Sequence, residues 1–155
     1  MKVSVQLSLG KYSCAGCSVE MWWVLWMRAI SPEPADWVNA WHGDTEEYFE
    51  SGKDFAMPVV IEQSGATETA RTLLRELNLD SRARQLVDRP PGLRGASYNP
   101  NRCPRCAHVA DWDMLEHLVI EAAHHQHALW RLRPVEVSPA RWAYLIEEQH
   151  SIRGF

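Results

Sequence analysis

Several features that would mark whole classes of protein are missing from this chain of 155 residues. It has no run of about 18 consecutive apolar residues, so we expect no membrane-spanning helix. Its formal net charge of -4 differs from the basic excess of proteins that coat nucleic acid. A glycine-rich phosphate loop, a Gly-x-Ser-x-Gly elbow and a dinucleotide fingerprint are also missing, which leaves the enzyme classes that depend on them without support.

The start of the chain shows no continuous apolar segment of the kind that a signal peptide needs. Residues 3–9 instead alternate apolar and polar side chains, as a β-strand does. We therefore expect a cytoplasmic protein, in a reducing compartment where paired cysteines bind metal more readily than they form disulfides. Apolar residues make up 46% and charged residues 23% of the chain. These proportions are ordinary for a globular protein, and we expect a single domain spanning residues 1–155.

All four cysteines occur in two Cys-x-x-Cys motifs, formed by Cys14 with Cys17 and by Cys103 with Cys106. A spacing of two residues lets a tight turn direct both sulfurs at one metal, and Zn²⁺ takes four thiolates in tetrahedral geometry. The long separation between the motifs is no obstacle, because the cost of closing a loop grows slowly with its length. We predict that these four cysteines bind one structural Zn²⁺.

Two other uses of the cysteines remain open. A redox-active dithiol needs its second cysteine to enter a helix, whereas Cys17 leads into an expected strand. A catalytic or labile metal is the other alternative, although a site with four cysteine ligands is coordinatively closed.

The second cysteine motif belongs to a longer pattern. Residues 94–106 read RGASYNPNRCPRC, and Ala-Asp-Trp follows at residues 110–112. This pattern resembles the second half of small, largely uncharacterised bacterial zinc-ribbon proteins, in which a Tyr and an Asn precede Cys-Pro-x-Cys. The resemblance implies zinc ligation by the four cysteines and carries no activity with it. The chain departs from the pattern at Ser18 and Ala107, where glycine is usual.

Hydrophobic periodicity divides the rest of the chain into short strands and helices. We expect strands at residues 3–9, 19–28, 58–62 and 130–137. We expect helices at 31–43, at 45–50, at 67–77 with Thr67 or Ser64 as the cap, at 80–87 with Asp80 as the cap, from Asp111 or Asp113 to 129, and at 141–149 with Trp142, Leu145 and Ile146 facing inward. The uninterrupted apolar run in the second strand indicates a strand that is covered on both faces.

We therefore predict an α+β fold with a zinc-ribbon β-sheet at its core. The two halves of the ribbon are residues 1–30 and 94–112, and a helical region, residues 31–93, is inserted between them. Residues 113–155 form a C-terminal helix–strand–helix.

Three further groups of side chains suggest functions. His117, Glu121 and His125 share one face of the long expected helix and would suit a second metal or acid–base chemistry, although a solvated polar face is the simpler interpretation. Several tryptophans, of the eight in the chain, could form either a core or a partner surface. Arginines cluster near the second motif: Arg82, Arg84, Arg89, Arg94, Arg102 and Arg105.

These observations favour a binding or adaptor protein over an enzyme, with structural zinc holding a surface for a protein partner. The alternative is a nucleic-acid-interacting accessory protein that uses the arginine-rich loop, which the net charge disfavours. The third hypothesis is a metal-dependent hydrolase with its site on the histidine-rich helix.

Overall fold

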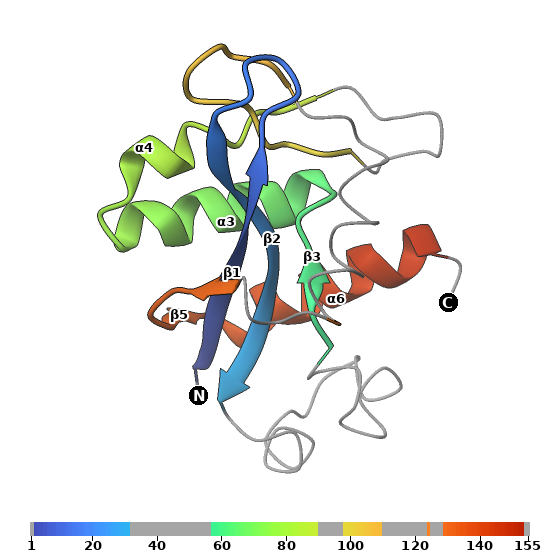
Figure 1. Ribbon diagram of the computed structural model, residues 1–155. Coiled ribbons are helices and arrows are strands. Elements are labelled where there is room, and N and C mark those ends of the chain that lie inside the picture. Colours follow the sequence, from blue (N-terminus) through green and yellow to red (C-terminus); the bar gives the residue numbers. More distant parts are fainter. Residues whose placement is uncertain (1, 32–56, 90–97, 110–123, 125–128, 154–155) are drawn as a thin grey trace.

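The computed structural model of the chain describes residues 2–31, 57–89, 98–109, 124 and 129–153 (Figure 1). In this part of the chain, five strands form one antiparallel sheet in the order β3-β2-β1-β4, with β5 also paired to β1. The elements are β1 (Val3–Ser13), β2 (Glu20–Ser31), β3 (Val59–Val60), α3 (Ser64–Glu76), α4 (Asp80–Ala83), β4 (Leu129–Arg131), β5 (Val135–Val137) and α6 (Pro139–Arg153). The predicted α+β class is confirmed.

The centre of the sheet is a long antiparallel hairpin of β1 and β2, which pair from Ser4 opposite Ser31 to Ser13 opposite Glu20. The predicted end of the first strand at Leu9 was too early, because the chain stays paired as far as Ser13 and the first cysteine motif forms the turn of the hairpin. One extra residue, Leu25, forms a bulge in β2 where the register shifts.

One face of the sheet packs against helices α3 and α6, which cross behind the strands in Figure 1. Alternate side chains of β1 from Val3 to Leu9 point to this face, as the period of a strand requires. The buried residues from the helices that meet them are Ala66, Ala70, Leu73, Leu74, Trp142, Leu145 and Ile146. This cluster is the main hydrophobic core.

The opposite face carries a second cluster at the end of the hairpin that holds the cysteines. Here Trp23 and Trp26 of β2 lie across from Gly10 and Ser8. A Cβ atom on Gly10 would lie 2.8 Å from a methyl carbon of Leu25. The prediction that this strand is covered on both faces is therefore confirmed.

Helix α3 begins at Ser64, three residues before Thr67, and its N-cap is Gln63, so neither expected cap, Thr67 or Ser64, takes that position. The backbone N–H of Gly65 donates to Oε1 of Glu148 on α6 at 3.3 Å, which satisfies one of the free N–H groups at the helix start. Helix α4 is shorter than predicted. Its first helical residue is Asp80, which was expected to be the N-cap, and Leu86 leaves the helix to form a β-bridge with Asn101.

The C-terminal segment was predicted correctly for its last helix and wrongly for its strand. Trp142, Leu145 and Ile146 of α6 are buried as expected. The single strand at residues 130–137 is instead two short strands, because the apolar alternation shifts by one residue before Val135 and Pro134 has no N–H to donate.

The helices expected at 31–43, 45–50 and 113–129 lie almost entirely outside the described residues. The last of them cannot extend to Leu129, which already belongs to β4. The domain boundaries, the zinc-ribbon classification and the C-terminal helix–strand–helix remain predictions. Among the described residues, no helix is long and apolar enough to cross a membrane.

Candidate metal centre

The two cysteine motifs fold into knuckles with the same backbone geometry. In each knuckle, the N–H of the first cysteine, Cys14 or Cys103, donates at 2.8 Å to the carbonyl oxygen five residues further on. The residue after the second cysteine donates its N–H back to the carbonyl oxygen of the first. These bonds measure 2.8 Å for Ser18 and 3.0 Å for Ala107. The knuckles are therefore structural repeats of one another.

Closing this turn requires a left-handed backbone at the residue that follows each pair. Ser18 has φ of 63° and Ala107 has φ of 62°, values that favour glycine. These are the positions where the zinc-ribbon pattern has glycine. The chain thus keeps the turn conformation although it lacks the residue that adopts it most easily.

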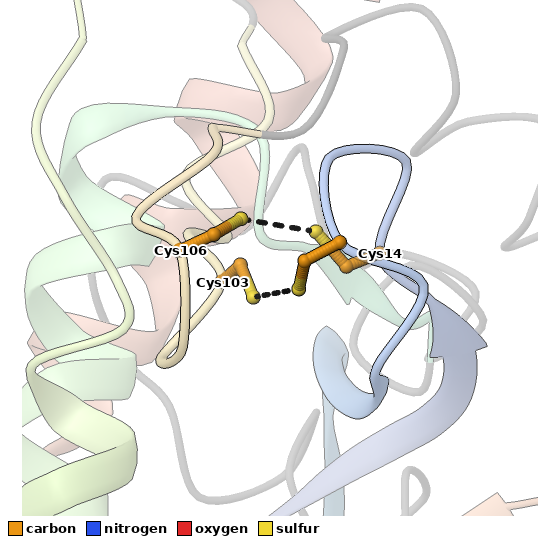
Figure 2. Close-up of side chains that lie close together, drawn as sticks. Cys14, Cys103 and Cys106 are labelled. Carbon is orange, nitrogen blue, oxygen red and sulfur yellow. Dashed lines mark hydrogen bonds between the residues drawn. The ribbon is translucent and has the colours of Figure 1, made fainter.

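The knuckles bring the four sulfurs together at one end of the hairpin, the upper end in Figure 1. Figure 2 shows the sulfurs of Cys103 and Cys106 facing those of the first knuckle. The Sγ atoms of Cys14 and Cys106 are 3.6 Å apart, those of Cys17 and Cys103 are 3.7 Å apart, and all four lie within 4.8 Å of one another. Four sulfurs about 2.3 Å from a central Zn²⁺ form a tetrahedron with edges of about 3.8 Å. The four cysteines, which are free thiols, are close enough to hold a metal ion.

Backbone N–H groups lie close to both buried sulfurs. The N–H of Gly16 lies 3.3 Å from Sγ of Cys14, and the N–H of Arg105 lies 3.4 Å from Sγ of Cys103. Burial opposes ionisation of Cys103, but hydrogen bonds from the backbone of Cys106 and Arg105 and from neighbouring thiols lower its pKa to about 6.

The pKa of Cys106 shifts in the opposite direction to that of Cys103. The backbone of His108 favours the Cys106 thiolate, but desolvation and the three nearby cysteines outweigh it and raise the pKa of Cys106 to about 12. Without a cation, the thiolate is therefore favoured at Cys103 and the thiol at Cys106. A divalent metal supplies the positive charge that lets all four ionise.

Close packing between the knuckles depends on Gly16. A Cβ atom at this position would lie 2.9 Å from Cβ of His108 and 3.0 Å from Sγ of Cys106. The two knuckles can approach this closely only because Gly16 has no side chain.

The second knuckle is anchored to the sheet by a buried asparagine. The side-chain oxygen of Asn101 accepts the N–H of Val24 at 2.9 Å, and its amide nitrogen donates to the carbonyl oxygen of Val24 at 3.1 Å. Asn99 Oδ1 accepts the backbone N–H and the side-chain amide of Asn101, each at 3.0 Å. Asn101 is the asparagine of the zinc-ribbon pattern. The sequence indicated its position but not this role.

Several arginines near the second knuckle support the backbone of this region. Arg89 donates to the carbonyl oxygen of Asn99 at 2.8 Å, and Arg102 donates to that of Arg84 at 3.1 Å. Arg82 lies 4.7 Å from the ring centre of Trp130. Arg105 is exposed, whereas Arg94 lies outside the described residues. The predicted arginine-rich loop is thus partly structural.

The tryptophans of the described residues belong mainly to the core. Trp23, Trp26 and Trp142 are buried, while Trp22 and Trp130 are half-buried and meet edge to face with ring centres 5.5 Å apart. Trp37, Trp41 and Trp112 lie outside the described residues, as do His117, Glu121 and His125. Within the described ranges, no group of three metal-ligating side chains other than the four cysteines occurs.

Comparisons of the chain with protein-family models, with curated proteins and with solved structures find no match. The likeness to a zinc ribbon therefore depends on the cysteine pairs and on their clustering.

Proposed function

We propose that this chain is a non-catalytic binding protein whose four cysteines hold one structural Zn²⁺ and thereby fix a surface for a protein partner. The observation that carries the proposal is the set of sulfur separations, 3.6 and 3.7 Å across the two knuckles. They fit a closed tetrahedral site, and closed sites stabilise folds instead of binding substrates.

The chemistry of the ligands favours zinc. Tetrahedral sites with four thiolates select zinc or iron, and zinc is the usual ion for two Cys-x-x-Cys knuckles in a small fold. The ion would supply positive charge and a cross-link when bound to Cys14, Cys17, Cys103 and Cys106. The protein would supply the shape of the surface.

Three large apolar side chains support a protein partner. Ile30 is 44% exposed, Met57 is 40% exposed and Tyr144 is 47% exposed. Ile30 is the last residue but one of β2 and Met57 precedes β3, and the antiparallel pairing of these strands places both at the end of the sheet away from the cysteines. Exposed aromatic and methionine side chains are enriched at protein interfaces.

The metal content of the purified protein tests the first half of the proposal. We expect about one equivalent of zinc per chain, and a large loss of zinc in Cys103→Ser because three thiolates bind Zn²⁺ more weakly than four. Ser13→Ala, which changes an exposed neighbour of the first knuckle, should retain the zinc. Less than about half an equivalent of zinc in the wild type, or iron in its place, would contradict this half.

Affinity purification tests the second half. We expect Ile30→Ala to lose a co-purifying protein that Arg28→Ala, an exposed control on the same strand, retains. Salt-sensitive RNA or DNA binding that Arg105→Ala weakens would favour the nucleic-acid alternative. A second bound metal that is lost in His117→Ala and His125→Ala would favour the hydrolase.

A further inference from the structure

A cavity of about 460 Å³ opens beside the second knuckle, and the candidate metal ligand Cys103 is among the residues that line it. One wall is the segment that begins in α4 and the other is the knuckle itself. The lining residues are Ser81, Arg84, Gln85, Arg102, Cys103, Pro104 and Ala107. The volume falls within the range of about 300 to 1,000 Å³ that is typical of small-molecule sites.

The described residues that line this cavity include two cationic side chains. Arg84 and Arg102 contribute two guanidinium groups, Ser81 contributes a hydroxyl group, and none of these described lining residues is a carboxylate. Among the described residues, neither arginine forms an ion pair. Two guanidinium groups at one cavity favour an anionic ligand, because guanidinium binds phosphate and carboxylate with charge-assisted hydrogen bonds.

We propose that this cavity binds the phosphate group of a phosphomonoester. Two positive charges match the charge of a phosphate dianion, and the guanidinium and hydroxyl donors match its terminal oxygens. The cavity exceeds the size of a bare phosphate, and Pro104 and Ala107 offer apolar contacts to the organic part of the ligand. A small phosphorylated metabolite with a flat body, such as a mononucleotide, fits this description.

The position of the cavity couples it to the metal centre. Four of its seven lining residues belong to residues 102–107, which the four-cysteine site holds in place. The N–H of Arg102 also donates to the carbonyl oxygen of Gln85 at 2.8 Å, which joins the two walls. Removal of the metal should therefore weaken phosphate binding, and by reciprocity the ligand should slow metal loss.

Calorimetric titration of the metal-loaded protein tests the proposal, with AMP, inorganic phosphate and adenosine as probes. We expect AMP to bind with one site per chain, inorganic phosphate to bind more weakly at the same site, and adenosine to show no binding. Arg84→Gln should weaken AMP binding by roughly tenfold or more, because it removes a charge-assisted contact. Gln85→Glu, which is nearly isosteric, should abolish binding because it directs a negative charge at the phosphate.

Arg28→Gln is the matched control, since it removes an equally exposed arginine near the far end of the sheet and should leave AMP binding unchanged. The zinc content of every variant shows that its knuckles are intact, independently of phosphate binding. No saturable binding of AMP or phosphate would overturn the proposal, as would equal affinities in Arg84→Gln and the wild type. Tight binding of an oligoribonucleotide without terminal phosphate, with none of AMP, would also overturn it and identify the site as a polynucleotide contact.

Discussion

At the scale of single residues, the metal centre depends on two side chains in an unfavourable backbone conformation. Ser18 and Ala107 both have left-handed φ values, a conformation that costs residues with a Cβ atom roughly 1–2 kcal/mol. The hydrogen bonds that close each knuckle, and the metal that we propose, offset this cost. The strain is therefore located beside the ligands, where substitution by glycine can relieve it.

We predict that Ala107→Gly stabilises the protein by about 1 kcal/mol, because glycine adopts positive φ without steric cost. The measurement is the free energy of unfolding in denaturant. Ala15→Gly is the control: it makes the same change inside the first knuckle, where φ is not positive, and should destabilise by about 0.5 kcal/mol through the entropy of the unfolded chain. Equal effects of the two substitutions would contradict the proposed relief of strain.

At the scale of elements, two side-chain amides take the place of missing strand neighbours. Asn101 pairs with both the N–H and the carbonyl of Val24, as an adjacent strand would. Gln149 of α6 does the same for β3, because its oxygen accepts the N–H of Val60 at 2.8 Å and its nitrogen donates to the carbonyl of Pro58 at 3.0 Å. Backbone groups that would otherwise be buried without partners are thus satisfied.

We predict that Asn101→Asp destabilises the protein by about 2–4 kcal/mol, because it replaces a buried amide donor with a charge beside the carbonyl oxygen of Val24. The same variant should bind zinc more weakly, since Asn101 anchors the second knuckle. Thermal unfolding and a competitive zinc titration measure the two effects. Asn78→Asp makes the same chemical change at an exposed residue and should alter stability by less than about 0.5 kcal/mol. Equal losses in the two variants would contradict this role for Asn101.

At the scale of the whole molecule, the four-cysteine site joins the turn of the central hairpin to a segment far along the chain. Cys14 and Cys106 are 92 residues apart. Closing so long a loop lowers the conformational entropy of the chain. A cross-link between its ends can offset this unfavourable contribution to folding. Binding of Zn²⁺ to a folded site contributes directly to folding stability. The metal would therefore act on the fold as a whole.

The dependence of this cross-link on pH has a definite sign. Because the folded pKa of Cys103, about 6, lies below its ordinary value of 9.0, its thiolate stabilises the folded chain fully above pH 9 and loses this effect as pH falls through about 6. Protons compete with the metal for all four sulfurs in the same direction. We predict that zinc stays bound at neutral pH and is released below about pH 6, with a parallel fall in melting temperature. Release that increases with rising pH would contradict the prediction.

The spacing of apolar residues was enough to predict most of the described elements. It placed β2, α3 and α6, and it identified the buried stripe of Trp142, Leu145 and Ile146, because periodicity reports directly which side chains face a core. The spacing of apolar residues did not predict contacts with residues that are distant in the chain. The local pattern offered Ser64 or Thr67 as the cap of α3, whereas the N–H of Gly65 at the helix start donates to Glu148, 83 residues further along the chain.

The sequence by itself identified the candidate metal ligands, because four cysteines in two closely spaced pairs leave few other arrangements for their sulfurs. It also determined the class of the fold through the periods of its apolar residues. Only the tertiary structure decided that Ser18 and Ala107 adopt the turn that glycine usually makes, that Asn101 clamps the second knuckle to β2, and that Arg84, Gln85 and Arg102 share a cavity. The reason is physical: ligand spacing and periodicity are local properties of the chain, whereas strain, buried hydrogen bonds and cavities arise from residues that meet only when the chain has folded.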